Sequence, residues 1–122
     1  MSNRIKVIIK NVDEEPRIAE IDNNYDAISS IVGGLVEHIY LSNEVGCWMN
    51  EEGKINQLPF NILLQDCKGK TFDCMVGNLV LIQENDATVC VDLTDENLEK
   101  YLKQIQNNVL RCDYIDLEKF VV

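Results

Sequence analysis

A diglycine at Gly33-Gly34 constrains the fold more than any other feature, because it separates a helical pattern from an extended one. Apolar residues at positions 28, 31, 32 and 35 recur at helical spacing, which predicts a helix that begins near Tyr25. A glycine inside a helix costs about 1 kcal/mol, so the pair is expected to end this helix in left-handed geometry. Residues 35–41 then alternate as a strand. Because the helix dipole is negative at this end, the diglycine is interpreted as a structural stop and not as a phosphate loop.

The same two patterns, helical spacing and strand alternation, predict the secondary structure of other segments. Alternation predicts strands at residues 4–10, 17–21 and 45–49, and the stretches 78–83 and 88–93 are predicted to form a hairpin central in the sheet. The segment LPFN, residues 58–61, is expected to be an ordered loop, and residues 62–66 are compatible with a helix or a strand. Residues 71–75 are read as weakly extended, and the apolar C-terminal tail is expected to dock on the core or on a neighbouring subunit.

A second helix has the clearest start signal in the chain, with Thr94 as its cap and acidic residues in its first turn. Its predicted buried stripe comprises Leu98, Tyr101, Leu102, Ile105 and Val109. With 122 residues the chain falls in the single-domain range. The sequence therefore predicts one compact α+β domain over residues 1–122, with a mainly antiparallel sheet and two principal helices.

The net charge of −10, from 21 acidic and 11 basic side chains, limits the partners. It argues against a sequence-independent binder of duplex nucleic acid, which needs a basic face. It leaves open an anionic small ligand held by a few Lys or Arg groups. No run approaches the roughly 18 apolar residues of a membrane span, and the N-terminus lacks a signal-peptide pattern. We expect a cytoplasmic protein that does not contact a membrane.

The chemistry-bearing residues do not form a catalytic pattern. Five cysteines, an odd number without a C-x-x-C pair, favour buried thiols in a reducing compartment. The lone histidine, His38, lacks a companion at zinc-ligand spacing, belongs to no Ser/His/Asp set, and is the only neutral-pH base that a thiol nucleophile could use. We therefore expect no metal, no cofactor, no catalytic residue and no enzymatic activity.

Candidate ligand contacts are concentrated between residues 40 and 61, with one basic residue outside this stretch. Aromatic side chains could stack on a base, amides could read a base edge or a ribose hydroxyl, and basic groups could contact phosphate. The residues predicted to bind ligand are Tyr40, Trp48, Asn50, Lys54, Phe60, Asn61 and Arg111. Each has a structural alternative: the aromatics as core, the asparagines as turn caps and the cations as solvated surface charges.

The order IDNN, ISSIVGGLVEHIYL, NEEGKINQLPFN and LVLIQENDATVCVDLTDENLEKYL, from about Pro16 to Leu102, resembles a family of small uncharacterised domains common in Firmicutes and their phages. The positions that match its motifs are Gly33, Gly34, Asn50, Gly53, Lys54, Leu58, Pro59 and Asn61. Within that neighbourhood the chain is similar to the phage anti-Thoeris sponge proteins, which bind cyclic ADP-ribose isomers and related cyclic nucleotides without cleaving them.

That resemblance implies a phage or prophage anti-defence protein that sequesters a cyclic nucleotide in the host cytoplasm. It also implies a homo-oligomer, either a dimer or a trimer of dimers, with ligand held near protomer interfaces. Two alternatives stay open. The charge would suit an acidic interaction protein or nucleic-acid mimic that inhibits a host defence enzyme. A small enzyme acting on nucleotides is the other.

Overall fold

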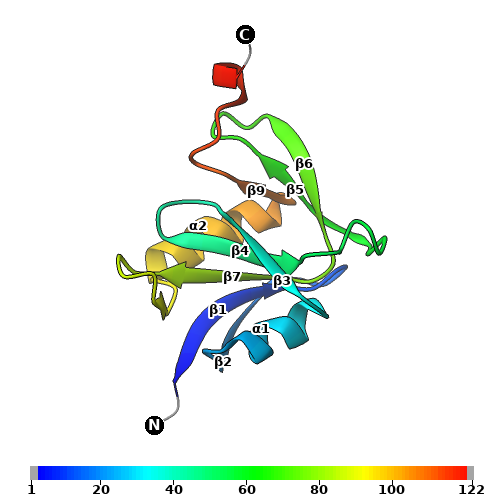
Figure 1. Cartoon of the computed structure of the whole chain (residues 1–122). Coiled ribbons are helices and arrows are strands. Elements are labelled where there is room, and N and C mark those ends of the chain that lie inside the picture. Colours follow the sequence, from blue (N-terminus) through cyan, green and yellow to red (C-terminus); the bar gives the residue numbers. More distant parts are fainter. Residues whose placement is uncertain (1–2, 121–122) are drawn as a thin grey trace.

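The structure, a computed structural model, describes residues 3–120 and contains two sheets and two α-helices (Figure 1). Within that range the strands are β1 (Arg4–Lys10), β2 (Arg17–Asp22), β3 (Val36–Tyr40), β4 (Val45–Asn50), β5 (Phe60–Gln65), β6 (Thr71–Val76), β7 (Leu79–Glu84), β8 (Cys90–Val91) and β9 (Val109–Arg111). The helices are α1 (Tyr25–Val32), α2 (Asp95–Gln106) and the short 3₁₀ helix η1 (Leu117–Phe120).

The strands form one large and one small sheet. In the large sheet the order is β2-β1-β7-β4-β3, all neighbours are antiparallel, and β8 pairs with β7. In the small sheet the order is β6-β5-β9, and β9 runs parallel to β5. The prediction of a compact α+β domain with mainly antiparallel pairing and two principal helices is confirmed.

Two apolar cores lie on opposite faces of the large sheet, because alternate residues of each strand point to opposite sides. On one face, Ile28 and Val32 of α1 pack against side chains such as Val80 of β7. On the other face, α2 and the small sheet pack against the apolar side chains that point to that side, including Leu81 of β7. Figure 1 shows α1 and α2 on these opposite sides. The second core therefore joins the two sheets.

Both helix starts and the first helix stop have the predicted local chemistry. Asn24 Oδ1 accepts a hydrogen bond from Ala27 N at 2.8 Å, and Thr94 Oγ1 accepts one from Asn97 N at 3.2 Å. Gly33 follows α1 with a φ of 83°, the left-handed geometry that glycine adopts most easily. The apolar stripe predicted for each helix included one residue too many, because Leu35 lies beyond α1 and Val109 lies in β9.

Three strand predictions need correction or resolution. The expected loop at residues 58–61 is wrong at its end, because β5 begins at Phe60, which pairs with Val76. Residues 62–65 continue that strand, which decides between the helix and strand alternatives. Of residues 88–93, only Cys90–Val91 pair, so β7 is central as predicted whereas β8 is not. Pairing with β6 across the turn at residues 66–70, and with β9 after α2, extends β5 back to Phe60.

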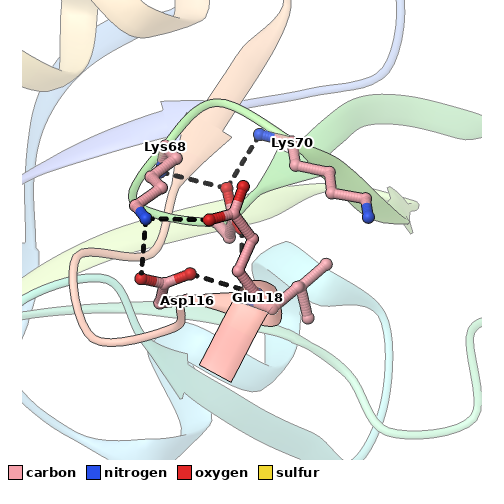
Figure 2. Close-up of polar contacts among 6 residues, drawn as sticks. Lys68, Lys70, Asp116 and Glu118 are labelled. Atoms are coloured by element: carbon pink, nitrogen blue, oxygen red, sulfur yellow. Dashed lines mark hydrogen bonds and ion pairs between the residues drawn. The ribbon is translucent and has the colours of Figure 1, made fainter. Parts of the chain in front are cut away.

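The tail after β9 is tied to the turn between β5 and β6 by a fully buried carboxylate, Asp66. Its Oδ1 accepts hydrogen bonds from Lys68 N at 3.0 Å and Lys70 N at 2.8 Å, and its Oδ2 accepts one from Leu117 N at 3.1 Å. Figure 2 shows the surrounding contacts, in which Lys68 Nζ pairs with Asp116 and with Glu118. The expected docking of the tail on the domain is therefore observed.

Candidate ligand-binding cleft

A cleft of about 410 Å³ lies where β3 and β4 of the large sheet face β5 and β6 of the small sheet. We call it the inter-sheet cleft. Its volume falls within the roughly 300–1,000 Å³ typical of small-molecule sites. It is lined by Glu37, His38, Ile39, Met49, Asn50, Glu51, Lys54, Ile55, Leu64, Asp73, Cys74, Met75 and Val76.

Apolar side chains from both sheets form the walls of the inter-sheet cleft. Leu64 and Met75 of the small sheet are buried, and Ile39 and Met49 of the large sheet pack against the same core. Ile55, on the turn between β4 and β5, is 81% exposed at the cleft. These walls can accept a flat apolar group such as an aromatic base.

The charged groups that line the cleft are three carboxylates, from Glu37, Glu51 and Asp73, and one ammonium, from Lys54. Lys54 Nζ donates a hydrogen bond to Asp73 Oδ1 and forms an ion pair with it. This bond raises the pKa of Lys54, and the charges of Asp73 and Glu37 act in the same direction. The same bond holds the pKa of Asp73 below its ordinary value. Lys54 is therefore a protonated cation with a carboxylate partner that an anionic ligand would have to displace.

The turn that carries Lys54, residues 51–57, is built on Asn50. Asn50 Oδ1 accepts a hydrogen bond from Glu52 N at 2.8 Å, and its Nδ2 donates to Val32 O at the end of α1 at 3.3 Å. Gly34 makes this approach feasible, because a Cβ at position 34 would lie 2.9 Å from Asn50 Nδ2. The diglycine and the asparagine of the NEEGK motif are therefore one packing unit, and the turn-cap interpretation of Asn50 holds in this structure.

Tyr40 and Trp48 lie on the opposite face of β3 and β4 from the cleft walls. Trp48 packs against the core beneath α1, and the His38 ring stacks on it with a centroid distance of 4.3 Å. Tyr40 meets His38 edge to face at 5.0 Å, and its hydroxyl donates to Glu84 Oε2 at 3.3 Å. The predicted stacking aromatics, Tyr40 and Trp48, are therefore not in the lining of the inter-sheet cleft, although His38, around which they pack, is.

The remaining predicted ligand contacts are also dispersed. Phe60 and Asn61 line a second cleft beside the turn between β1 and β2. Arg111 lies on β9, where its Nη2 donates to Gln65 Oε1 at 3.4 Å. Of the seven predicted residues, Asn50 and Lys54 are the two that line the inter-sheet cleft.

Sequence reasoning missed Glu37, Ile39, Met49 and Asp73 as cleft residues. The alternation of β3 and β4 contained part of the signal, since side chains at 37, 39 and 49 must face away from those at 38, 40 and 48. No sequence pattern indicated Asp73, because its proximity to Lys54 depends on how the two sheets pack.

Titratable groups elsewhere do not converge on a metal or nucleophile site. Within residues 3–120 no group of three or more His, Cys, Asp or Glu side chains could hold a metal ion. All five cysteines are free. Burial raises the pKa of the Cys112 thiol to about 11 and also raises that of Cys47, which disfavours thiolates. None of the helices in the described range is long and apolar enough to cross a membrane.

Comparison with known proteins gives one family. The profile of the domain of unknown function DUF3846 matches residues 5–106, which is most of the chain and includes both helices. No curated protein and no solved structure matches the chain. The chain belongs to the DUF3846 family.

Proposed function

We propose that this member of the DUF3846 family binds a cyclic nucleotide signal, such as a cyclic ADP-ribose isomer, in the inter-sheet cleft and releases it unchanged. A phage or prophage protein of this kind would withhold the signal from host defence enzymes. The observation that carries the proposal is one cleft that combines apolar walls with a protonated Lys54. The motif resemblance supplies the ligand class.

The charges in the cleft dictate how such a ligand would lie. The base would pack between Ile39, Met49 and the small sheet, where apolar area is removed from water. Exocyclic amines of the base could donate to the Glu37 carboxylate. The phosphates would lie at Lys54 and would compete with Asp73 for its ammonium.

Calorimetry with a panel of cyclic ADP-ribose isomers and cyclic dinucleotides tests this proposal. We expect saturable heat with at least one compound, and heating the complex should release that compound with its mass and retention time unchanged. Amide resonances of residues 37–39 and 51–55 should shift on binding. Absence of heat with every compound, or recovery of an altered ligand, contradicts the proposal.

A second candidate ligand class is an amine, favoured by the three carboxylates that line the cleft with the single Lys54. Spermidine is a suitable probe because it carries ammonium groups on a flexible apolar chain. The two classes respond oppositely to charge removal: Asp73→Asn should strengthen nucleotide binding and weaken spermidine binding. Binding of spermidine alone would replace the nucleotide proposal.

Assembly is the remaining part of the proposal. A dimer or trimer of dimers would bury exposed apolar side chains, of which Ile55 is 81% exposed at the cleft itself. Native mass spectrometry reports oligomer mass and bound ligand together. A monomer at every concentration, still binding ligand, would remove the oligomer from the proposal and leave the cleft in place.

A further inference from the structure

A second cleft, of about 630 Å³, lies beside the turn between β1 and β2 and has a different chemistry from the inter-sheet cleft. We call it the Lys10 cleft. Its lining comes from the end of β1, the turn at residues 13–16, the start of β5 and the end of α2. No residue is shared with the lining of the inter-sheet cleft.

Lys10 places a buried charge in this cleft. The residue is only 7% exposed, and its Nζ donates to Asn11 O at 2.8 Å. No carboxylate among residues 3–120 lies within 4.0 Å of that nitrogen. An ammonium has three donors, so two are open to a ligand or solvent.

Asn61 contributes an unpaired acceptor. Its Nδ2 donates both hydrogens, to Lys10 O at 2.9 Å and to Gly77 O at 2.7 Å, so the orientation of the amide is determined by two carbonyl groups. The residue is 7% exposed, and its Oδ1 is buried without a donor in the described structure. A buried acceptor without a donor costs free energy, so a ligand hydroxyl here would be favourable.

The rim of the Lys10 cleft adds three exposed carboxylates, Asp13, Glu14 and Glu15, and the ring of Phe60, which is 52% exposed. The carboxylates oppose an anion, and the buried Lys10 ammonium opposes a cation. A neutral hydroxyl satisfies both, because it donates to a carboxylate or to Asn61 Oδ1 and accepts from Lys10. The C–H face of a sugar ring can pack on Phe60.

We propose that the Lys10 cleft is a second binding site, for a neutral polyhydroxyl ligand that presents a vicinal diol. A free sugar and the ribose of a nucleoside share this chemistry. The site is independent of the nucleotide proposal, since it uses none of the inter-sheet cleft residues.

NMR titration of the full chain with D-ribose, adenosine and 2′,3′-dideoxyadenosine tests the site. The Asn61 side-chain amide resonances should shift saturably with the diol compounds and not with the dideoxy compound. A response to ribose and adenosine alike identifies a sugar site, and a response to adenosine alone identifies a ribonucleoside site. Equal responses to adenosine and dideoxyadenosine, or no response to any probe, overturn the proposal.

Three variants locate the binding. Lys10→Met keeps the buried stem and removes the donors, so affinity should fall about tenfold. Phe60→Ala changes an exposed ring and should weaken binding roughly fivefold even if Lys10→Met fails to fold. Ile55→Ala, an exposed apolar change in the other cleft, should leave diol binding unchanged. Equal affinities for Phe60→Ala, Ile55→Ala and the parent protein contradict the site.

Discussion

Two irregular segments, the turn at residues 51–57 and the tail at residues 112–119, are held by different kinds of polar group. The turn is held by the neutral amide of Asn50, which bonds Glu52 N and Val32 O. The tail is held by the buried carboxylate of Asp66. An amide keeps its hydrogen bonds at every pH, whereas a carboxylate loses acceptors when it is protonated. The hydrogen bonds of Asn50 are therefore expected to persist in acid, even though the Lys54–Asp73 ion pair of the same turn would be lost, whereas the bonds from Asp66 to the tail are not.

The largest effect is expected for Asp66→Ala. Removal of the carboxylate leaves three N–H groups, from Lys68, Lys70 and Leu117, without their acceptor. We expect the melting temperature to fall by about 10 °C or more, with loss of amide protection in the tail. Thermal denaturation and hydrogen exchange measure this. The control Asp86→Ala changes an exposed carboxylate and should melt like the parent protein. Equal melting of the two variants would show that Asp66 does not hold the tail.

A smaller effect is expected at the turn, where a double-mutant cycle isolates one contact. Asn50→Ala should cost about 1–2 kcal/mol because two hydrogen bonds are lost. Gly34→Ala should cost a similar amount, since its Cβ would displace the Asn50 amide. In the Asn50→Ala background, Gly34→Ala should cost little, and urea denaturation of the four proteins gives the coupling.

Gly33→Ala is the matched control for that cycle. Its penalty comes from the positive φ of 83°, and no atom lies within 4 Å of the added Cβ. The cost should therefore be the same with Asn50 or alanine at position 50. Coupling of Gly33 to Asn50, or additive costs for Gly34 and Asn50, would contradict the packing unit.

The smallest predicted effect is a difference between the turn and the tail in their response to acid. Burial of Asp66 raises its pKa, but three backbone N–H donors outweigh burial and hold the pKa below the ordinary value. Its contribution is therefore complete above the unfolded pKa of about 3.9 and is lost as pH falls through the lower folded pKa. During acid titration the protection factor of the Leu117 amide should fall in that low-pH range, while that of the Glu52 amide, whose acceptor Asn50 Oδ1 does not titrate, stays constant. Simultaneous changes at both amides would remove the distinction.

The sequence predicted what depends on neighbouring residues. Thr94 and Asn24 are local helix caps, and Gly33 is a local helix stop, so short-range chemistry sufficed. β5 was partly missed because its parallel partner β9 follows a whole helix, whereas its other partner, β6, is joined to it by the short turn at residues 66–70. Asp66 went unnoticed because an Asp before a Gly-containing turn has the ordinary turn pattern, and its burial by the tail is long-range.

The same distinction between local and long-range interactions applies to the candidate site. Lys54 and Asn50 could be selected because an exposed turn cation and a turn amide are visible in the sequence. The face of β3–β4 that lines the cleft could not be selected, since the aromatic residues lie on the opposite face. The packing of the small sheet against that face decides where the cleft is, and no local pattern encodes it.

The most direct test of the account is the affinity of the parent protein and four variants for one cyclic ADP-ribose isomer, measured by calorimetry. Lys54→Met removes the cation of the cleft and should weaken binding about tenfold. Asp73→Asn removes the competing carboxylate and should strengthen binding several-fold relative to the parent protein. Lys103→Met and Asp86→Asn are exposed charge controls and should leave the affinity unchanged. Opposite changes for Lys54→Met and Asp73→Asn support the inter-sheet cleft as the ligand site. Equal affinities for all variants, or changes in the same direction, contradict it.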